Sequence, residues 1–324
     1  MKDSLRRRIV SCILAAQGNP HKGLFAMAEI TLLDGSIGQE VVKRSGDRAT
    51  PLWSTAVMVD RPGVVGAIHA DYFAAGATIA TTNTYAVLRD RLQRAGLEDH
   101  FTELLNKAAA QAATARDTHG SGRVAAALGP LIASYRPDIC PPPDEAKPVY
   151  AELVKLLEPS ADLFLIETVA SLEHAKGALL GCAGTDKPVW LAASVSDEDG
   201  TLLRSGEPLA ALAPLVEEFQ PDAVLLNCSR PEVIGEGLEI VKAFGKPYGA
   251  YANGFTRISE SFLKDAPTVD ALEQRQDLGP VAYAEFAMGW VAQGATITGG
   301  CCEVGPEHIA ELARQLRAAG HRIV

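Results

Sequence analysis

The chain has 324 residues, and 47% of them are hydrophobic, which is enough apolar surface for one large buried core. Acidic residues outnumber basic ones by 40 to 30, giving a formal net charge of -10. This charge argues against a nucleic acid or an anionic membrane as the partner. No apolar run reaches the roughly 18 residues needed to cross a bilayer, so no membrane span is expected.

The cysteine content indicates where the protein works. Six cysteines are scattered along the chain, unlike the dense framework of a small secreted domain, so we expect a reducing, cytoplasmic environment. At the N-terminus, three arginines precede a short apolar stretch, a pattern weakly similar to a signal peptide. Because Met27 directly precedes the first strand-like segment, "EITLLDG", an upstream start or a dispensable extension is favoured. The predicted organisation is an extension over 1–28 and a single domain over 29–324.

Short apolar runs alternate with longer amphipathic stretches. Eight runs are predicted as strands, at 30–33, 77–81, 124–128, 163–166, 189–195, 223–226, 248–251 and 295–298. Apolar residues at spacings of three and four predict helices over 63–74, 101–116, 148–157, 171–180, 209–219 and 281–293. The Pro-rich segment over 135–148 is predicted as an ordered loop. Eight strand–helix units favour a single (β/α)8 TIM barrel over a doubly wound sheet, whose GxGxxG sequence is missing.

Active sites of such barrels form at the carboxyl ends of the strands, so reactive residues there are the best candidates for chemistry. The predicted strand ends carry Asp34, Asn83, Tyr85, Glu167, Ser194, Ser196, Asn227, Cys228, Asn253, Cys301 and Cys302. Three of the six cysteines therefore fall at the ends of the sixth and eighth strands. We expect their side chains to face one funnel, although 73 positions separate the first two in sequence.

Three thiolates with one open position are typical of a catalytic zinc site, because a closed structural site needs a fourth protein ligand. In "TITGGCCEVGPEHI", Gly299 and Gly300 would let both following thiols point inward, where a Cβ would crowd the metal. Two alternatives stay open at this point. Adjacent cysteines can form a strained vicinal disulfide. A buried cysteine can also act as a small hydrophobic residue, which is how we interpret Cys12, Cys140 and Cys182.

The segments "LLNCSRP", "TITGGCCEVGPEHI", "ATIATTNTY" and "DLFLIET" together resemble the homocysteine S-methyltransferase family, over about residues 30–315. This family includes enzymes that use S-methylmethionine or S-adenosylmethionine, betaine-homocysteine methyltransferase, and the homocysteine module of cobalamin-dependent methionine synthase. The resemblance implies a barrel whose Zn²⁺ is held by Cys228, Cys301 and Cys302, with the homocysteine sulfur at the fourth position. Coordination would deprotonate a thiol that, with a pKa of about 8.5, is mostly protonated at neutral pH.

The resemblance also implies substrate contacts. Asp34 in "LDG" and Glu167 in "IET" match acidic positions associated with the amino group of homocysteine, whereas the residues alone leave a helix cap or an ion pair equally open. Asn227 and Thr298 are predicted to orient the zinc thiolates. Tyr85, directly after "TTNT", falls where the family places contacts to the methyl donor.

Several loops depart from the family's common pattern, and these loops shape the donor side. They are "DGSIG" where a double glycine is common, "GPLIASYRPD", and "YANGF" with Ala252 in place of proline. A methyl group attacked at neutral pH must already be electrophilic, and aromatic faces bind small onium cations with about 0.5 to 2 kcal/mol per contact. Tyr85 is the favoured aromatic contact, ahead of Trp53, a packing candidate, and Tyr135, a loop residue.

The predicted function is zinc-dependent transfer of a methyl group from a small onium donor to homocysteine, giving methionine. S-methylmethionine or another sulfonium is favoured over betaine. Two alternatives are the homocysteine module of a split cobalamin-dependent methionine synthase and a non-catalytic zinc- or thiol-binding protein. The expected partners are homocysteine and a small methyl donor, and the sequence leaves assembly into a homo-oligomer open.

Overall fold

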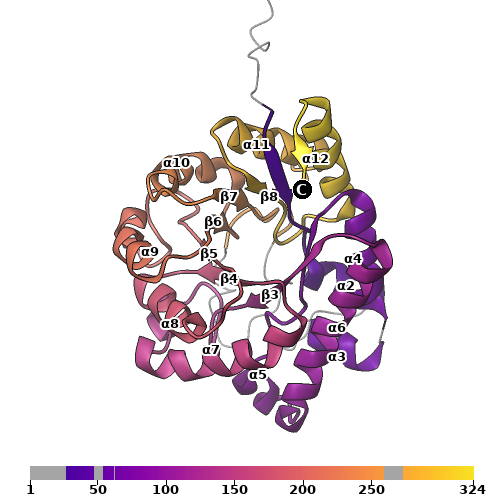
Figure 1. Ribbon diagram of the computed structural model, residues 1–324, viewed down its shortest axis with the longest axis vertical. Helices are drawn as coiled ribbons and strands as arrows, with labels where there is room; N and C mark the ends of the chain where they lie inside the picture. The colour runs from indigo at the N-terminus through magenta and orange to yellow at the C-terminus, as the bar shows by residue number, and fades with distance from the viewer. Residues whose placement is uncertain (1–26, 47–53, 62, 259–272) are drawn as a thin grey trace, which may run out of the picture.

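The computed structural model describes residues 27–46, 54–61, 63–258 and 273–324, which form a ring of parallel strands surrounded by helices (Figure 1). The barrel strands are β1 (Glu29–Leu32), β2 (Ile79–Thr81), β3 (Arg123–Leu128), β4 (Leu163–Val169), β5 (Val189–Ala193), β6 (Ala223–Asn227), β7 (Tyr248–Tyr251) and β8 (Ile297–Thr298). Each strand from β2 to β8 pairs with the next, and β8 pairs with β1. A parallel bridge between Leu33 and Ile79 joins β1 to β2. The predicted (β/α)8 barrel is confirmed.

The helices lie outside this ring, as Figure 1 shows. They are α2 (Ile37–Ser45), α3 (Ser54–Asp60), α4 (Val64–Ala75), α5 (Arg89–Arg94), α6 (Phe101–His119), α7 (Pro143–Leu157), α8 (Leu172–Cys182), α9 (Ala213–Phe219), α10 (Pro231–Lys242), α11 (Pro280–Ala292) and α12 (Pro306–Ala318). Short 3-10 turns are η1 (Glu98–His100), η2 (Pro137–Ile139), η3 (Glu158–Ser160) and η4 (Leu209–Leu212). Small buried residues let helices approach the sheet closely, as Ala108, Ala109 and Ala112 do in α6.

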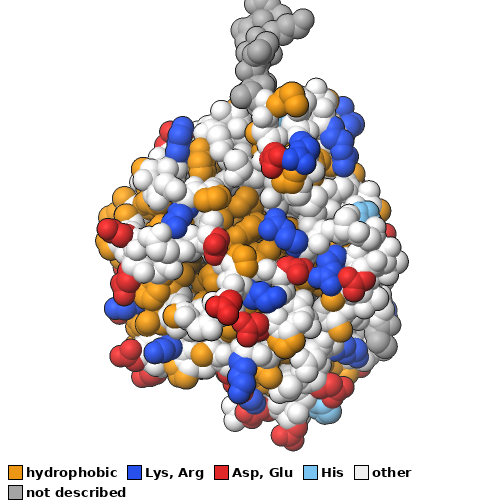
Figure 2. Space-filling model, in the orientation of Figure 1, with side chains coloured by type: hydrophobic (Ala, Val, Ile, Leu, Met, Phe, Trp, Pro, Cys, Tyr) orange, Lys and Arg blue, Asp and Glu red, His pale blue; other side chains and the backbone are white. Residues whose placement is uncertain are grey.

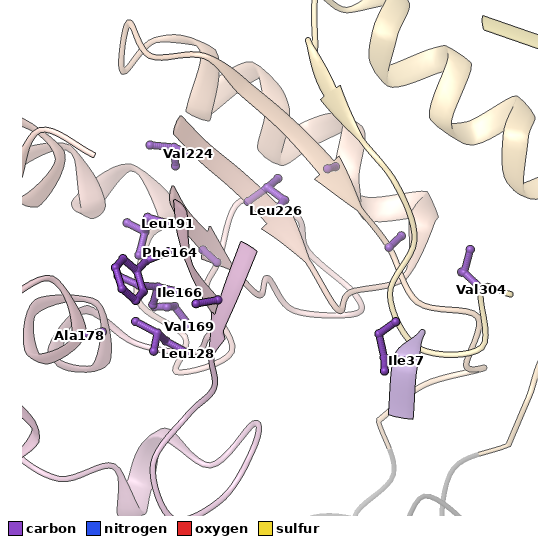
Figure 3. Close-up of a cluster of buried hydrophobic side chains, with 14 of the residues drawn as sticks. Ile37, Leu128, Phe164, Ile166, Val169, Ala178, Leu191, Val224, Leu226 and Val304 are labelled. Carbon is purple, nitrogen blue, oxygen red and sulfur yellow. The ribbon is translucent and has the colours of Figure 1, made fainter. Parts of the chain in front are cut away.

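Two apolar layers explain why the strands are continuous hydrophobic runs. Along β4, Phe164 and Ile166 point outward and pack with Leu191 and Leu226 between sheet and helices (Figure 3). The alternate residues of the barrel strands form a second cluster inside the ring, including Leu163, Leu165, Trp190, Leu225 and Tyr251. Because a parallel strand of a barrel is buried on both faces, both sets of alternating residues are apolar.

The surface seen in the same orientation mixes acidic and basic side chains without a large area of one sign (Figure 2). This distribution agrees with the modest excess of acidic residues in the sequence. It gives this face no continuous basic area of the kind that binds nucleic acid.

The start of α7 differs from its prediction. The helix begins at Pro143, so the second half of the predicted loop over 135–148 is helical, and Pro148 lies inside the helix instead of at its start. A proline at the first helical position loses no hydrogen bond, whereas Pro148 removes one bond within the helix.

Other differences are smaller. β5 ends at Ala193, and Val195 instead makes an antiparallel bridge to Leu203. A short strand that was not predicted, β9 (Arg322–Ile323), pairs in parallel with the start of β1. The predicted helix ranges also contained none of α2, α3, α5, α10 and α12. The predicted extension, apart from its last two residues, and Trp53 lie outside the described residues. None of the described helices has the length and apolarity to cross a membrane.

Candidate active site and metal centre

Three cysteines meet at the carboxyl end of the barrel. Cys228 directly follows β6, and Cys301 and Cys302 follow β8 after two glycines. Their sulfur atoms all lie within 4.8 Å of one another. Cys228 is buried, the other two are half-buried, and all three pack with Tyr135 and Phe255. The fold thus brings together the three cysteines that the sequence singled out.

Two of the three sulfurs are joined instead of being free. Cys228 and Cys301 form a disulfide whose Cα atoms are 5.8 Å apart, whereas Cys302 is a free thiol. The pairing expected as an alternative, between the adjacent Cys301 and Cys302, is therefore not formed. The ends of β6 and β8 place two sulfurs close enough either to bond or to share a ligand. Because the thiolate is the metal-binding form of cysteine, metal binding here requires the reduced pair.

The two glycines before Cys301 have a different role from the one expected. A Cβ at Gly299 would collide with the side chain of Leu33, and one at Gly300 would collide with Val304. The absence of side chains lets the end of β8 approach the turn after β1, where the N–H of Gly300 donates to the carbonyl of Asp34 at 2.9 Å. The glycines are needed for packing between two strand ends, and this packing fixes Cys301 beside the pocket.

A pocket lies beside the cysteines. Its described lining includes Asp34, Tyr85, Glu167, Cys228, Cys301 and Cys302, six of the eight predicted site residues. No lysine or arginine is among the described residues that line it. The pocket is therefore acidic and partly aromatic, a combination suited to a cationic group.

Asp34 follows β1 and is only 2% exposed. Its carboxylate accepts hydrogen bonds from the backbone N–H of Thr81 at 2.6 Å and from the Thr81 hydroxyl at 2.7 Å. Burial raises the pKa of Asp34 to about 8, although these two hydrogen bonds oppose the shift, and nearby Glu167 adds to it. The side chain is aligned by neighbouring β2 and would gain from a cationic partner.

Glu167 had been predicted to follow the fourth strand. It lies within β4 instead, because β4 continues to Val169. One carboxylate oxygen accepts a hydrogen bond from the hydroxyl of Tyr251 at 3.0 Å. Burial raises the pKa of Glu167 to about 7, against the effect of that bond. The next residue, Thr168, has a φ of +60°, and the pairing of β4 with β5 is irregular here. The strand therefore changes its local course where the carboxylate enters the pocket.

Aromatic side chains form part of the pocket wall. Tyr85 lies in the loop after β2, and its hydroxyl is 2.8 Å from the hydroxyl of Ser134, in a hydrogen bond that either group can donate. A Cβ at Gly129 would collide with Tyr85, so that glycine makes room for the ring. Tyr135 and Phe255 also line the pocket. Tyr135 is thus a pocket residue, which the sequence had left undecided.

Asn227 and Thr298 do not line the pocket, in contrast to the other predicted site residues. Asn227 is fully buried, and its side-chain oxygen accepts the N–H of Thr168 at 3.0 Å while its amide nitrogen donates to the Thr168 hydroxyl at 3.3 Å. Asn227 therefore supports the backbone next to Glu167. Thr298 is fully buried in β8, and its hydroxyl has no hydrogen-bond partner among the described residues.

The remaining strand-end candidates have mixed roles. Asn83 lines the pocket and accepts a 2.5 Å hydrogen bond from the Ser54 hydroxyl. The hydroxyl of Ser194 donates to the Asn227 carbonyl at 2.7 Å, and the amide of Asn253 donates to the Cys228 carbonyl at 3.0 Å. Ser196 bonds Glu198 in an exposed turn.

Some lining residues were not identified from the sequence. Tyr251 ends the predicted seventh strand, so its position gave a usable signal. Phe255 belongs to the loop "YANGF", which the sequence singled out without naming this residue, whereas Gln39 lies in a segment with no signature.

The donor set fits a soft divalent metal. Three clustered sulfurs and no described histidine or carboxylate in the same cluster favour zinc over hard cations that prefer oxygen. Burial raises the pKa of the Cys302 thiol to about 12, so a thiolate at this position needs a nearby cation. The reduced residues present therefore match Zn²⁺ in number and chemistry.

The fold and the site together define a (β/α)8 barrel with a three-sulfur cluster beside an acidic pocket. The family model for homocysteine S-methyltransferase matches residues 31–316. The chain is 28% identical to homocysteine S-methyltransferase YbgG of Bacillus subtilis, over 93% of this chain and 98% of that one. It is 27% identical to a homocysteine S-methyltransferase of Escherichia coli, over 92% of this chain and 98% of that one.

A solved structure is also similar. The homocysteine methyltransferase MmuM from Escherichia coli, in its metallated form, superposes with a TM-score of 0.75 at 25% identity, covering 92% of this chain and 100% of MmuM. The chain belongs to the homocysteine S-methyltransferase family. The family, the fold and the enzyme class predicted from the sequence are therefore confirmed.

Proposed function

We propose that this enzyme transfers a methyl group from a small onium donor to the thiol of homocysteine, with Zn²⁺ held by Cys228, Cys301 and Cys302. The observation that carries the proposal is the convergence of three sulfurs within 4.8 Å at the edge of a pocket containing two buried carboxylates. When bound, Zn²⁺ would supply a soft cation that keeps the substrate thiol deprotonated and therefore nucleophilic.

Asp34 and Glu167 are the proposed partners of the homocysteine ammonium group. Both carboxylates are at least nine-tenths buried and lie in the same pocket as the sulfurs. Burial without a cation raises the pKa of each, so an ammonium group arriving between them would be a favourable counter-charge. Thr81 and Tyr251 hold the two carboxylates in place through hydrogen bonds.

The methyl donor is proposed to be a sulfonium such as S-methylmethionine, ahead of betaine. The described pocket wall contains no basic side chain, and Tyr85, Tyr135 and Phe255 give it aromatic surface. A small cation gains about 0.5 to 2 kcal/mol from each aromatic face, whereas a basic wall would repel it. In the transfer, the homocysteine sulfur bonds the methyl carbon, the donor's sulfur–carbon bond breaks, and its electron pair stays on the departing thioether.

The test is to supply the reduced, zinc-loaded protein and homocysteine with one donor at a time and to detect methionine by mass spectrometry. Homocysteine labelled in its carbon chain marks the methionine that is formed from it, because S-methylmethionine leaves the reaction as a second, unlabelled methionine. We expect turnover with S-methylmethionine and less with betaine. Turnover only with methylcobalamin or a corrinoid protein would contradict the onium proposal, and zinc binding without any turnover would indicate a non-catalytic binding protein.

A further inference from the structure

A buried ion pair lies behind the cysteine cluster, outside the pocket wall. Asp197 and Arg204 belong to the segment after β5, where Val195 and Leu203 form an antiparallel bridge. The guanidinium donates to Asp197 through two nitrogens, at 2.7 and 3.3 Å. The Asp197 side chain is only 4% exposed and the Arg204 side chain 11%, so this is not a solvent-screened surface pair.

Asp197 connects three segments at the carboxyl end of the barrel. Besides Arg204, its carboxylate accepts the backbone N–H of Arg230, after β6, at 3.3 Å and that of Ile258, after β7, at 3.0 Å. One buried carboxylate therefore fixes the segments that follow β5, β6 and β7 relative to one another. Four donors therefore converge on this one carboxylate.

Arg204 links Asp197 to the main chain of Cys228. Its second terminal nitrogen donates to the Cys228 carbonyl at 3.2 Å, beside the Asn253 amide at 3.0 Å. The same guanidinium stacks over the ring of Tyr135, with 4.8 Å between its central carbon and the ring centroid. Cys228 has a φ of +52°, a left-handed conformation that a residue with a Cβ adopts only when its surroundings enforce it.

We propose that Arg204 and Asp197 are positioning residues for Cys228, holding its main chain in the conformation that directs its sulfur toward Cys301 and Cys302. This inference rests on the proposed zinc function. It assigns to Arg204 a task that lysine cannot do, because one planar guanidinium serves a carboxylate, a carbonyl and an aromatic face together. Loss of such outer contacts typically weakens metal binding by roughly 10- to 100-fold.

The test measures zinc dissociation constants of the reduced full-length chain by chelator competition, together with the melting temperatures of the metal-free proteins. The variants are Arg204→Met, Arg204→Lys and Asp197→Asn. Arg116→Met is the matched control, because Arg116 pairs with Asp162 at 2.7 Å before β4, at the opposite end of the barrel, and Asp162 also accepts a backbone N–H.

We expect roughly 10- to 100-fold weaker zinc binding in Arg204→Met, less weakening in Arg204→Lys, and no change in zinc binding in Arg116→Met. If Arg204→Met does not fold, the zinc dissociation constants of Arg204→Lys and Asp197→Asn test the inference in its place. Wild-type affinity in the folded Arg204 and Asp197 variants would overturn the inference alone. Failure of the wild-type protein to bind zinc would overturn the proposed function as well, so the two failures are distinguishable.

Discussion

At the scale of single residues, Asp34 and Glu167 hold the least favourable charges in the pocket. Burial raises the pKa of Asp34 to about 8 and that of Glu167 to about 7, from ordinary values of 3.8 and 4.5. Such a pair is costly in the empty protein and becomes favourable when a cation enters. The favourable electrostatic interaction of these carboxylates therefore forms only when a cationic group of the substrate binds.

Replacing Glu167 with glutamine should weaken homocysteine binding without removing zinc. The amide side chain would keep an oxygen for the Tyr251 hydroxyl but lose the charge that faces the ammonium group. A hydrogen bond to a charged group contributes about 2 kcal/mol, so KM should rise roughly 30-fold. Steady-state kinetics with metal analysis checks this result. Glu311→Gln, which removes the partner of the exposed Arg314 on α12, is the control, and an unchanged KM in Glu167→Gln would make Glu167 structural.

The same substitution should change how stability depends on pH in the metal-free protein. Because the folded pKa of Glu167 is raised, its contribution to stability is complete below about pH 4 and is lost as pH rises through about 7. Glutamine does not titrate. From pH 5 to pH 8, the free energy of unfolding of Glu167→Gln should therefore rise relative to that of the wild type by roughly 2 to 3 kcal/mol. Denaturant unfolding at several pH values measures this difference, and a constant difference would show that Glu167 is not desolvated.

At the scale of elements, the turn between β8 and α12 positions two of the three cysteines by packing against the end of β1. A Cβ at Gly300 would overlap the Val304 side chain and approach the backbone of Gly35. The turn and the β1 end must therefore move apart before any larger residue fits. Such a movement would also displace Cys301 and Cys302.

Gly300→Ala should therefore lower both zinc affinity and melting temperature. Gly289→Ala in α11 is the matched control, because nothing lies within 4 Å of its Cβ position and alanine favours a helix interior by about 1 kcal/mol over glycine. Calorimetry and chelator competition on the two variants separate the effects. Wild-type zinc affinity in Gly300→Ala would show that the tight turn is not needed for the metal site.

The elements were predicted well where local sequence decides them. Each barrel strand buries both faces, so all eight appeared as apolar runs between amphipathic segments. The predicted start of α7 was wrong because apolar spacing placed it at Pro148, whereas the helix begins at Pro143. β9 has only two residues, and its pairing with β1 depends on the assembled barrel.

At the scale of the whole molecule, the barrel converts distant sequence positions into one site. Cysteines and acidic residues at strand ends could be predicted, because the fold brings those ends together. The contacts of Asp197 and Arg204 could not, since they join segments after three different strands through geometry that no motif encodes. Tyr135 was one of three aromatic candidates, but its place in the pocket also depends on the folded chain.

Metal removal should destabilise the whole molecule. Zinc bound only to the folded, reduced chain stabilises it by about 2.7 kcal/mol at a free concentration roughly 100 times the dissociation constant. A chelator should therefore lower the melting temperature of the reduced wild type, and Cys302→Ser should show no such response. Cys182→Ser is the control, since Cys182 lies buried in the apolar layer of α8. Equal responses in the wild type and Cys302→Ser would place the metal elsewhere.

X-ray absorption at the zinc edge of the reduced, zinc-loaded protein, with and without homocysteine, tests the central claim most directly. The account predicts three sulfurs at about 2.3 Å with one lighter ligand, and four sulfurs once homocysteine is added. The same measurement on Cys301→Ala should show loss of tight binding. Fewer than three sulfurs in the wild type, or no increase on adding homocysteine, would contradict the account.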